Sequence, residues 1–490
     1  MKVCLVILDG WGHNPKKILK DAIEDSNCIN MRQLSRNYAS YLIHANGKFV
    51  GLDDGSMGNS EVGHLTLGAG RIVKQNIVLI DEAFKDGSIK SKLHPLLLNK
   101  NKTLHLIGML SDGGIHSHIR HIKGLVENIQ VDFESVFIHC ISDGRDTAPD
   151  CFLKFYNELN ESIQDYKNCS IASVGGRFYA MDRDNNEDRI DKYFDNLTKK
   201  KTFSGGVEDY IKKQYRDGKN DENLLPVLFN SKGCISSDDC ILFCNFRADR
   251  MRQLTKKFIN NKNLIFTLTE YDKNFNVNVL FKTETVKETL ADVLEINKIE
   301  QVHIAETEKY AHVTYFFNGG NERIHKKEER KIIDSKKTES FADFPEMSSK
   351  LIADEVITNI SLEKQFIVSN FAAPDMVGHT GSYDSTKKAV EFVDEQIGRI
   401  YKACKNKDYV LIITADHGNA EIMFDEKNNK TNKKHTSNKV PLIITANKKS
   451  TSSQDWGYED SEYSLRDVSP TIINILNIKQ PSSMTGKSIL

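Results

Sequence analysis

Short apolar runs recur along the chain, and each one stops at a cluster of polar residues or glycines. The runs are six or seven residues long, are rich in valine and isoleucine, and lie at 3–8, 104–110, 135–141, 169–174, 240–246, 365–371 and 409–414. Runs of this kind are typical of parallel strands that are buried on both faces. Helix-like segments lie between them, for example at 119–127 and 385–404. The alternation predicts an α/β architecture.

Polar side chains gather where these runs end. Asp9 follows the first run, Asp375 comes four residues after the run 365–371, and Asp416 follows the run 409–414. In open α/β sheets, ligands bind at the carboxyl ends of the strands. We therefore expect the functional site of this protein among the residues that follow the apolar runs.

The composition narrows the class of protein. The chain has 490 residues, with 67 Lys plus Arg, 68 Asp plus Glu and a net charge of -1, which argues against a general nucleic-acid binder. No stretch approaches the roughly 20 apolar residues of a spanning helix. The nine cysteines show no C-x-x-C spacing, which favours free thiols in a reducing compartment. We expect a cytoplasmic monomer with neither a nucleic-acid nor a membrane partner.

Two polar segments look like surface structure. The lysine-rich stretch 325–337 is interpreted as a solvated segment, and the Asn- and Lys-rich stretch 425–434 as an exposed loop.

Three groups of residues have the composition of a metal site. In isolation each has an ordinary explanation, since an Asp at a strand end often caps a helix and a single His is often a surface residue. Asp375 and His379 are spaced i, i+4 and share one face if their segment is helical. Oxygen and nitrogen ligands at three separate strand ends suit a two-metal phosphoryl site with Mn²⁺, Zn²⁺ or Mg²⁺. The candidate ligands are Asp9, Asp375, His379, Asp416, His417 and His435.

Ser60 lies in the glycine-flanked segment 58–64 and has two compatible interpretations. It is a candidate helix N-cap between turn glycines. A serine at a helix start is also close to backbone N–H groups and the positive end of the helix dipole, which favour an attached phosphate. Metal coordination is one way to activate its hydroxyl group as a nucleophile.

Arginines follow the strand ends in the middle of the chain. Single surface arginines mean little, but several at strand ends suggest a cradle for an anionic substrate, because Arg binds carboxylate and phosphate through paired hydrogen bonds. Arg247 and Arg250 are three residues apart, so we expect them to share one face at a helix start. The set is Arg145 with Asp146, Arg177, Arg183, Arg247 and Arg250. His116, which follows a Ser-Asp-Gly-Gly segment, is a further candidate in the same part of the chain.

These motifs resemble those of the cofactor-independent phosphoglycerate mutases. The resemblance covers essentially the whole chain, and the motifs occur in the family order. They are the segments 8–12, 57–64, 111–118, 143–147, 176–184, 245–250, 305–310, 375–381, 414–419 and 484–488.

The resemblance implies a fold and a site. An alkaline-phosphatase-like α/β domain, residues 1–74 and 284–490, would be interrupted by an inserted α/β substrate domain, residues 75–283. One metal site would comprise Asp375, His379 and His435, and the other Asp9, Ser60, Asp416 and His417. The substrate would be held by His116, Arg145, Asp146, Arg177, Arg183, Arg247, Arg250 and Lys309.

The resemblance also implies a reaction, the interconversion of 3-phosphoglycerate and 2-phosphoglycerate in glycolysis and gluconeogenesis. Ser60 would carry the phosphoryl group, Lys309 would stabilise its charge, and Asp146 would act as acid and base in a closed, dry cleft. Two divalent ions are expected, Mn²⁺ first and Mg²⁺, Co²⁺ or Zn²⁺ as alternatives, with no need for 2,3-bisphosphoglycerate. The remaining alternatives are a phosphomonoesterase or phosphopentomutase of the same superfamily and a metal-binding pseudoenzyme. The inserted arginines argue against the phosphomonoesterase and the phosphopentomutase. The intact set of metal ligands argues against the pseudoenzyme.

Overall fold

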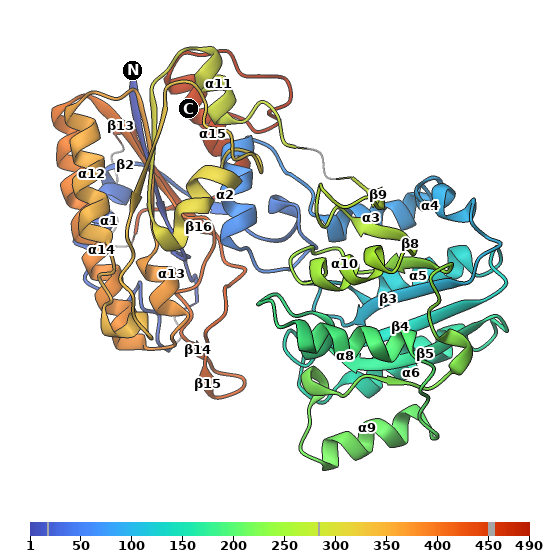
Figure 1. Cartoon of the computed structure of the whole chain (residues 1–490). Coiled ribbons are helices and arrows are strands. Elements are labelled where there is room, and N and C mark those ends of the chain that lie inside the picture. Colours follow the sequence, from blue (N-terminus) through green and yellow to red (C-terminus); the bar gives the residue numbers. More distant parts are fainter. Residues whose placement is uncertain (17–18, 283–284, 449–455) are drawn as a thin grey trace. The chain divides into compact units, whose positions relative to one another are not determined.

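The computed structural model describes residues 1–16, 19–282, 285–448 and 456–490 (Figure 1). The chain forms two compact units. We call Met1–Lys74 with Thr285–Leu490 the discontinuous unit, and Gln75–Glu284 the inserted unit. Each contains its own sheet with helices, so the predicted α/β class, with one unit interrupting another, is confirmed. The domain boundary expected at 283/284 lies outside the described residues.

The discontinuous unit is built on a mixed sheet. Its strands are ordered β11 (Glu328–Ile333), β10 (Gln301–Glu306), β12 (Phe366–Phe371), β1 (Lys2–Leu8), β13 (Tyr409–Thr414), β16 (Val440–Lys448), β2 (Tyr38–His44) and β17 (Glu459–Ser464). Strand β1 pairs in parallel with β12 and β13, so the three apolar runs predicted there as parallel strands are confirmed. Strand β16 is antiparallel to both of its neighbours and was not predicted.

Helices cover both faces of this sheet (Figure 1). On one face lie α1 (Ile29–Asn37), α12 (Ser349–Ser361) and α14 (Tyr383–Asn406), and on the other lie α2 (Ser60–Ala69), α11 (Leu290–Ile296) and α15 (Val468–Ile475). The short helix α13 (Ala373–Gly378) follows β12, and a π-helix spans His312–Phe316. Two-residue strands, β14 (Phe424–Asp425) and β15 (Lys430–Thr431), form a hairpin in the predicted loop.

The inserted unit has a largely parallel sheet. Its strands are ordered β6 (Val227–Leu228), β5 (Cys169–Gly176), β4 (Val136–Ser142), β3 (Leu104–Leu110), β7 (Cys240–Phe243), β8 (Leu264–Thr269) and β9 (Asn278–Phe281), and only β6 pairs antiparallel. Alternate residues of β3 enter different cores, Leu104 and Leu106 on one face and Ile107 and Met109 on the other. Burial on both faces explains why these strands are continuous apolar runs.

The helices of the inserted unit divide between the same two cores. The first core includes residues of α3 (Asn76–Asp86), α4 (Ile89–Leu97), α5 (Ile119–Ile129), α6 (Phe152–Ile163) and α9 (Val207–Arg216). The second includes residues of α7 (Arg177–Ala180), α8 (Glu187–Thr198) and α10 (Arg252–Asn260). The helix-like segments predicted at 119–127 and 385–404 lie within α5 and α14.

One surface interpretation was wrong. The lysine-rich stretch 325–337 contains β11, and His325 and Glu328 within it are only 3% and 7% exposed. The sequence pattern failed because strand β10, with which β11 pairs, and Asp292, one polar partner of His325, lie outside this stretch. The nine cysteines are free thiols. Within the described ranges, no helix is both long and apolar enough to cross a membrane.

Candidate active site

Ser60 begins helix α2 rather than capping it, which corrects the prediction. The cap is Asn59, whose side chain accepts a hydrogen bond from the backbone N–H of Val62 at 3.1 Å. The Ser60 hydroxyl is therefore not used for capping. Gly63 lets the helix approach the end of β13, since a Cβ atom there would lie 2.6 Å from the carbonyl oxygen of Asp416.

The Ser60 hydroxyl is surrounded by three charged or ionisable side chains. Its Oγ lies 2.8 Å from Nζ of Lys309, 3.0 Å from Nε2 of His417 and 3.3 Å from Oδ1 of Asp9. All four residues are at most 6% exposed. Asp9 follows β1, His417 follows β13 and Lys309 follows β10, so the ends of three parallel strands meet at the serine.

Lys309 bridges two buried carboxylates. Its Nζ lies 2.7 Å from Oδ1 of Asp9 and 2.8 Å from Oδ2 of Asp375. Burial disfavours the ammonium ion, but Asp375 and Asp9 outweigh it and raise the pKa of Lys309 well above its ordinary value. Asp416 is a third buried carboxylate beside His417. One lysine facing three carboxylates leaves a surplus of negative charge, which suits divalent cations.

The three histidines share one tautomer. Their Nδ1 atoms face backbone carbonyl oxygens, which accept hydrogen bonds only: Gly418 for His417 (3.2 Å), Lys433 for His379 (2.8 Å) and Gly58 for His435 (2.9 Å). Each Nδ1 must therefore carry a hydrogen, which leaves Nε2 as the atom through which each ring would bind a metal ion. These Nε2 atoms point at the carboxylates, with His379 and His435 both 3.3 Å from Oδ1 of Asp375. Backbone orientation of this kind is typical of metal-ligating histidines.

The donor set fits divalent metal ions. Donor atoms of Asp375, His417 and His435 lie within 4.8 Å of one another, as do those of Asp9, Asp416 and His417. Nε2 of His379 is 2.9 Å from Nε2 of His435. Oδ2 of Asp416 is buried and accepts no hydrogen bond from any described residue. The close approach of two Nε2 atoms and an unsatisfied carboxylate oxygen are each explained if the atoms are metal ligands. The structure thus brings all seven predicted ligands together, with His417 common to both groups.

Supporting residues that were absent from the predicted set hold these ligands in place. Asn370 donates to Oδ2 of Asp9 at 2.8 Å, and Asn419 donates to Oδ1 of Asp375 at 2.8 Å. Asn370 is a polar residue inside the apolar run 365–371, and this signal could have identified it.

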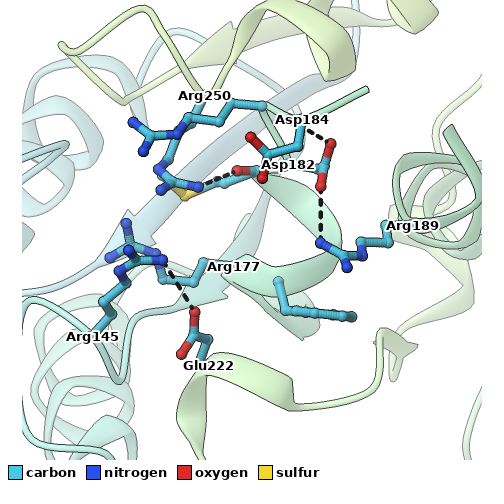
Figure 2. Close-up of a pocket in the computed structure, with 10 residues that line it drawn as sticks. Arg145, Arg177, Asp182, Asp184, Arg189, Glu222 and Arg250 are labelled. Atoms are coloured by element: carbon cyan, nitrogen blue, oxygen red, sulfur yellow. Dashed lines mark hydrogen bonds and ion pairs between the residues drawn. The ribbon is translucent and has the colours of Figure 1, made fainter. Parts of the chain in front are cut away.

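The inserted unit contains a cavity of about 260 Å³ that is rich in arginine (Figure 2). Four predicted substrate residues line it: Arg145, Arg177, Arg183 and Arg250. Burial and the guanidinium groups of Arg177 and Arg183 lower the pKa of Arg250, which indicates crowded positive charge. Such a cavity favours an anion. The other lining residues are Phe178, Met181, Asp182, Asp184, Arg189 and Glu222, and sequence reasoning did not select them.

Asp146 is held beside Arg177. Its Oδ2 accepts a hydrogen bond of 2.7 Å from Nη1 of Arg177, which is only 3% exposed. Nε2 of His116 lies 4.0 Å from the same carboxylate oxygen. Burial and the charge of Arg177 lower the pKa of His116 to about 3, so its ring is neutral at neutral pH.

Arg247 is not among the residues that line the cavity. Its Nε is 3.4 Å from Oδ1 of Asp249, and Nδ1 of His116 is 3.8 Å from the same atom. Helix α10 begins only at Arg252, so the predicted helical face shared by Arg247 and Arg250 is wrong. Both arginines lie in the irregular segment before the helix, where Nη1 of Arg250 donates to the carbonyl of Met181.

The fold and this donor set define a metal-dependent α/β enzyme, and the comparisons with known proteins agree. The model of the Metalloenzyme superfamily matches residues 1–480. A 2,3-bisphosphoglycerate-independent phosphoglycerate mutase of Clostridioides difficile (strain 630) is 39% identical over 513 residues, covering 100% of this chain and 99% of its own. The mutase of Brugia malayi is 40% identical over 518 residues, with coverages of 100% and 98%.

A solved structure agrees as well. Leishmania mexicana phosphoglycerate mutase, crystallised at low cobalt concentration, has a TM-score of 0.72 and 29% identity over 99% of this chain and 97% of that one. The chain belongs to the 2,3-bisphosphoglycerate-independent phosphoglycerate mutases, and with that family it is an enzyme that uses divalent metal ions.

Proposed function

We propose that this chain interconverts 3-phosphoglycerate and 2-phosphoglycerate through a phosphoserine at Ser60, with two divalent metal ions, preferably Mn²⁺. The observation that carries the proposal is the Ser60 hydroxyl, which has Lys309, His417 and Asp9 within 3.3 Å. When bound, the ions would lower the pKa of this hydroxyl and neutralise phosphate charge. Their ligands would be Asp375, His379 and His435 for one ion, and Asp9, Ser60, Asp416 and His417 for the other.

The protein side chains then have distinct roles. Oγ of Ser60, having lost its proton to solvent as the lowered pKa allows, attacks the phosphorus atom while the bond from phosphorus to the glycerate oxygen breaks. Asp146 supplies the proton that this glycerate oxygen needs. The glycerate reorients, Asp146 takes the proton from its other hydroxyl group, and the phosphoryl group returns to that oxygen. Lys309 lies beside Oγ and stabilises charge on the transferring group.

The arginines would hold the substrate by its anionic groups. Arg145, Arg177, Arg183 and Arg250 line one cavity, and a guanidinium group matches a carboxylate with two parallel hydrogen bonds. His116 and Arg247 adjoin this set through Asp146 and Asp249. A simple phosphomonoesterase would not need to retain glycerate, and the arginine cavity therefore favours the mutase over that alternative.

The test is a mutase assay of the purified protein without 2,3-bisphosphoglycerate, before and after Ser60→Ala. The wild-type protein should be active, and the variant should fold and bind metal but lack turnover. Brief incubation with labelled phosphoglycerate should mark the peptide 58–64 in the wild type alone. Ser56→Ala, four residues earlier and outside the site, is the matched control and should keep its activity. A label recovered on histidine would refute the mechanism.

A further inference from the structure

Asp143 lies at the carboxyl end of the strand β4 and has no part in the proposed chemistry. It is 1% exposed, yet its carboxylate accepts four hydrogen bonds. Oδ1 accepts from Nη1 of Arg177 at 2.6 Å and from the backbone N–H groups of Asp146 at 3.0 Å and Arg145 at 3.2 Å. Oδ2 accepts from the Ser111 hydroxyl at 2.6 Å.

These bonds join three strand ends in one network. Ser111 follows β3, Asp143 follows β4 and Arg177 follows β5. Between Asp143 and Arg145 the chain turns at Gly144, whose φ of +70° lies in the left-handed region that favours glycine. A Cβ atom at this glycine would lie 2.6 Å from the backbone nitrogen of Glu222. The turn is therefore tight, and it brings the backbone of Arg145 and Asp146 back to the Asp143 carboxylate.

The carboxylate is ionised although it is buried. Burial raises its pKa, but the hydrogen bonds from Ser111, the Asp146 backbone and Arg177 outweigh burial, and the pKa of Asp143 is below its usual range. A buried charge is tolerated only when partners satisfy it. The four donors provide this compensation, so the network forms a single unit in which each member depends on the others.

Arg177 is the central partner. Its Nη1 donates to Asp143 at 2.6 Å and to Asp146 at 2.7 Å, so one nitrogen holds two carboxylates. Arg177 also lines the arginine cavity. Without Asp143, the Arg177 side chain would keep Asp146 alone as an acidic partner among the described residues, and the loop with Arg145 and Asp146 would lose its anchor to the strand ends.

We propose that Asp143 is a positioning residue of the mutase reaction, which holds Arg145, Asp146 and Arg177 in the arrangement that retains glycerate. This inference rests on the proposed function. Asp143 acts through these three residues rather than by contact with the substrate. A purely structural Asp143 would instead stabilise the inserted unit without influencing the fate of the glycerate.

The ratio of hydrolysis to mutase product separates the two roles. It does not depend on the fraction of molecules that are folded, so a loss of stability alone leaves it unchanged. Asp143→Asn preserves the shape of the side chain and an acceptor oxygen but removes the charge that faces Arg177. Loss of a hydrogen bond to a charged group typically weakens an interaction by one to two powers of ten. We therefore expect the ratio of hydrolysis to mutase product to rise about 10- to 100-fold. KM for phosphoglycerate should rise while the protein remains folded.

Ser142→Ala is the matched control, because Ser142 is the preceding residue, is fully buried, and hydrogen-bonds to the carbonyl of Asp221 rather than to Asp143. It should leave both the ratio and KM unchanged. If Asp143→Asn fails to fold, Ser111→Ala removes a single bond to the same carboxylate, and a raised ratio in that variant supports the inference. An unchanged ratio and KM in the folded variant would overturn it.

A separate variant distinguishes this inference from the proposed function. Asp146→Asn should lose mutase turnover if Asp146 is the acid and base. Full activity in that variant would contradict the proposed function itself. An inactive Asp146→Asn together with an unaltered Asp143→Asn would contradict only the positioning role.

Discussion

Nζ of Lys309 lies 2.8 Å from Oγ of Ser60, and the same nitrogen contacts the carboxylates of Asp9 and Asp375. One ammonium group thus touches the candidate nucleophile and one carboxylate from each of the two metal-ligand groups. Lys309 is 4% exposed, so water screens these contacts poorly. The relationship places Lys309 both at the candidate active site and beside the buried acids.

Replacing Lys309 with methionine tests both roles. The substitution keeps the length of the side chain and removes its charge, leaving the Asp9 and Asp375 carboxylates without this partner. We expect the metal-free protein to lose about 3–5 kcal/mol of unfolding free energy, as when one partner of a buried ion pair is removed. Labelling of Ser60 should fall at least about 100-fold. Chemical denaturation and phosphoserine trapping measure the two effects.

Lys336→Met is the control for this substitution, because Lys336 is exposed and pairs with Glu346 at the surface. Neither stability nor labelling should change appreciably in it. Rapid labelling of Ser60 in Lys309→Met would exclude Lys309 from the transfer step.

Metal binding should release protons at neutral pH. Burial opposes the charged ring, but Asp416 and Asp9 raise the pKa of His417 to about 10. A raised pKa means that the ring carries a proton below about pH 10, and a metal ion must displace this proton to reach Nε2. The apparent affinity for Mn²⁺ should therefore fall as the pH is lowered from 8 to 6, by about tenfold per unit for each proton released.

Calorimetry of Mn²⁺ binding in two buffers with different protonation enthalpies counts the released protons. In parallel, exhaustive chelation should abolish mutase activity, and Mn²⁺ or another divalent ion should restore it. An affinity that is constant between pH 6 and pH 8 would argue against the histidine ligands, and full activity after metal removal would argue against a metal site.

Arg250 and Arg247 should differ in how strongly they retain glycerate. Arg250 lines the arginine cavity, whereas Arg247 is paired with Asp249 outside its lining. Loss of a charged hydrogen bond to the substrate typically costs about 1.5–3 kcal/mol, or one to two powers of ten. Arg250→Ala should therefore release free glycerate and inorganic phosphate as its mutase rate falls.

Arg247→Ala should show the same leakage to a smaller degree, because the Arg247 side chain would act on the bound glycerate only indirectly, through Asp249 and His116. The measurement is the ratio of hydrolysis to mutase product in each variant. Normal turnover and an unaltered ratio in Arg247→Ala would remove Arg247 from the site and leave it as a surface ion pair.

His325 should stabilise the fold in a pH-dependent way. Burial lowers its pKa, but hydrogen bonds to Asp292 and Glu328, at 2.9 and 2.8 Å, prevail and raise the pKa to about 9. Because the folded pKa exceeds the ordinary value of about 6.5, the stabilisation is complete below pH 6.5 and is lost as the pH rises through 9. His325→Gln should cost about 1–3 kcal/mol at pH 6 and less at pH 9.

Denaturant titrations of wild type and His325→Gln at pH 6, 7.5 and 9 give this difference directly. His94→Gln, which changes an exposed histidine, serves as the control and should show no such trend. A difference that stays constant from pH 6 to pH 9 would mean that the charge on His325 does not contribute.

The sequence by itself determined the α/β class and the strands near the site. Strands buried on both faces must be continuously apolar, so β1, β3, β4, β12 and β13 were recognisable as runs without any partner being known. The residue pattern and the family resemblance then selected the seven candidate ligands, Ser60 among them, and four of the arginines that line the cavity. Asp9, Asp416 and Arg145 lie just after strands, and Ser60 begins a helix, where local sequence carries a clear signal.

Only the tertiary structure decided which distant groups meet. Asn59, whose side chain accepts a hydrogen bond from the backbone N–H of Val62, takes the cap position in place of Ser60. The start of α10 at Arg252 excludes the expected helical face of Arg247 and Arg250. The burial of His325 depends on Asp292, 33 residues away, and the role of Asp143 depends on Ser111 and Arg177. Pairing of side chains between different strands is set by sheet order and packing, and neither leaves a local pattern in the sequence.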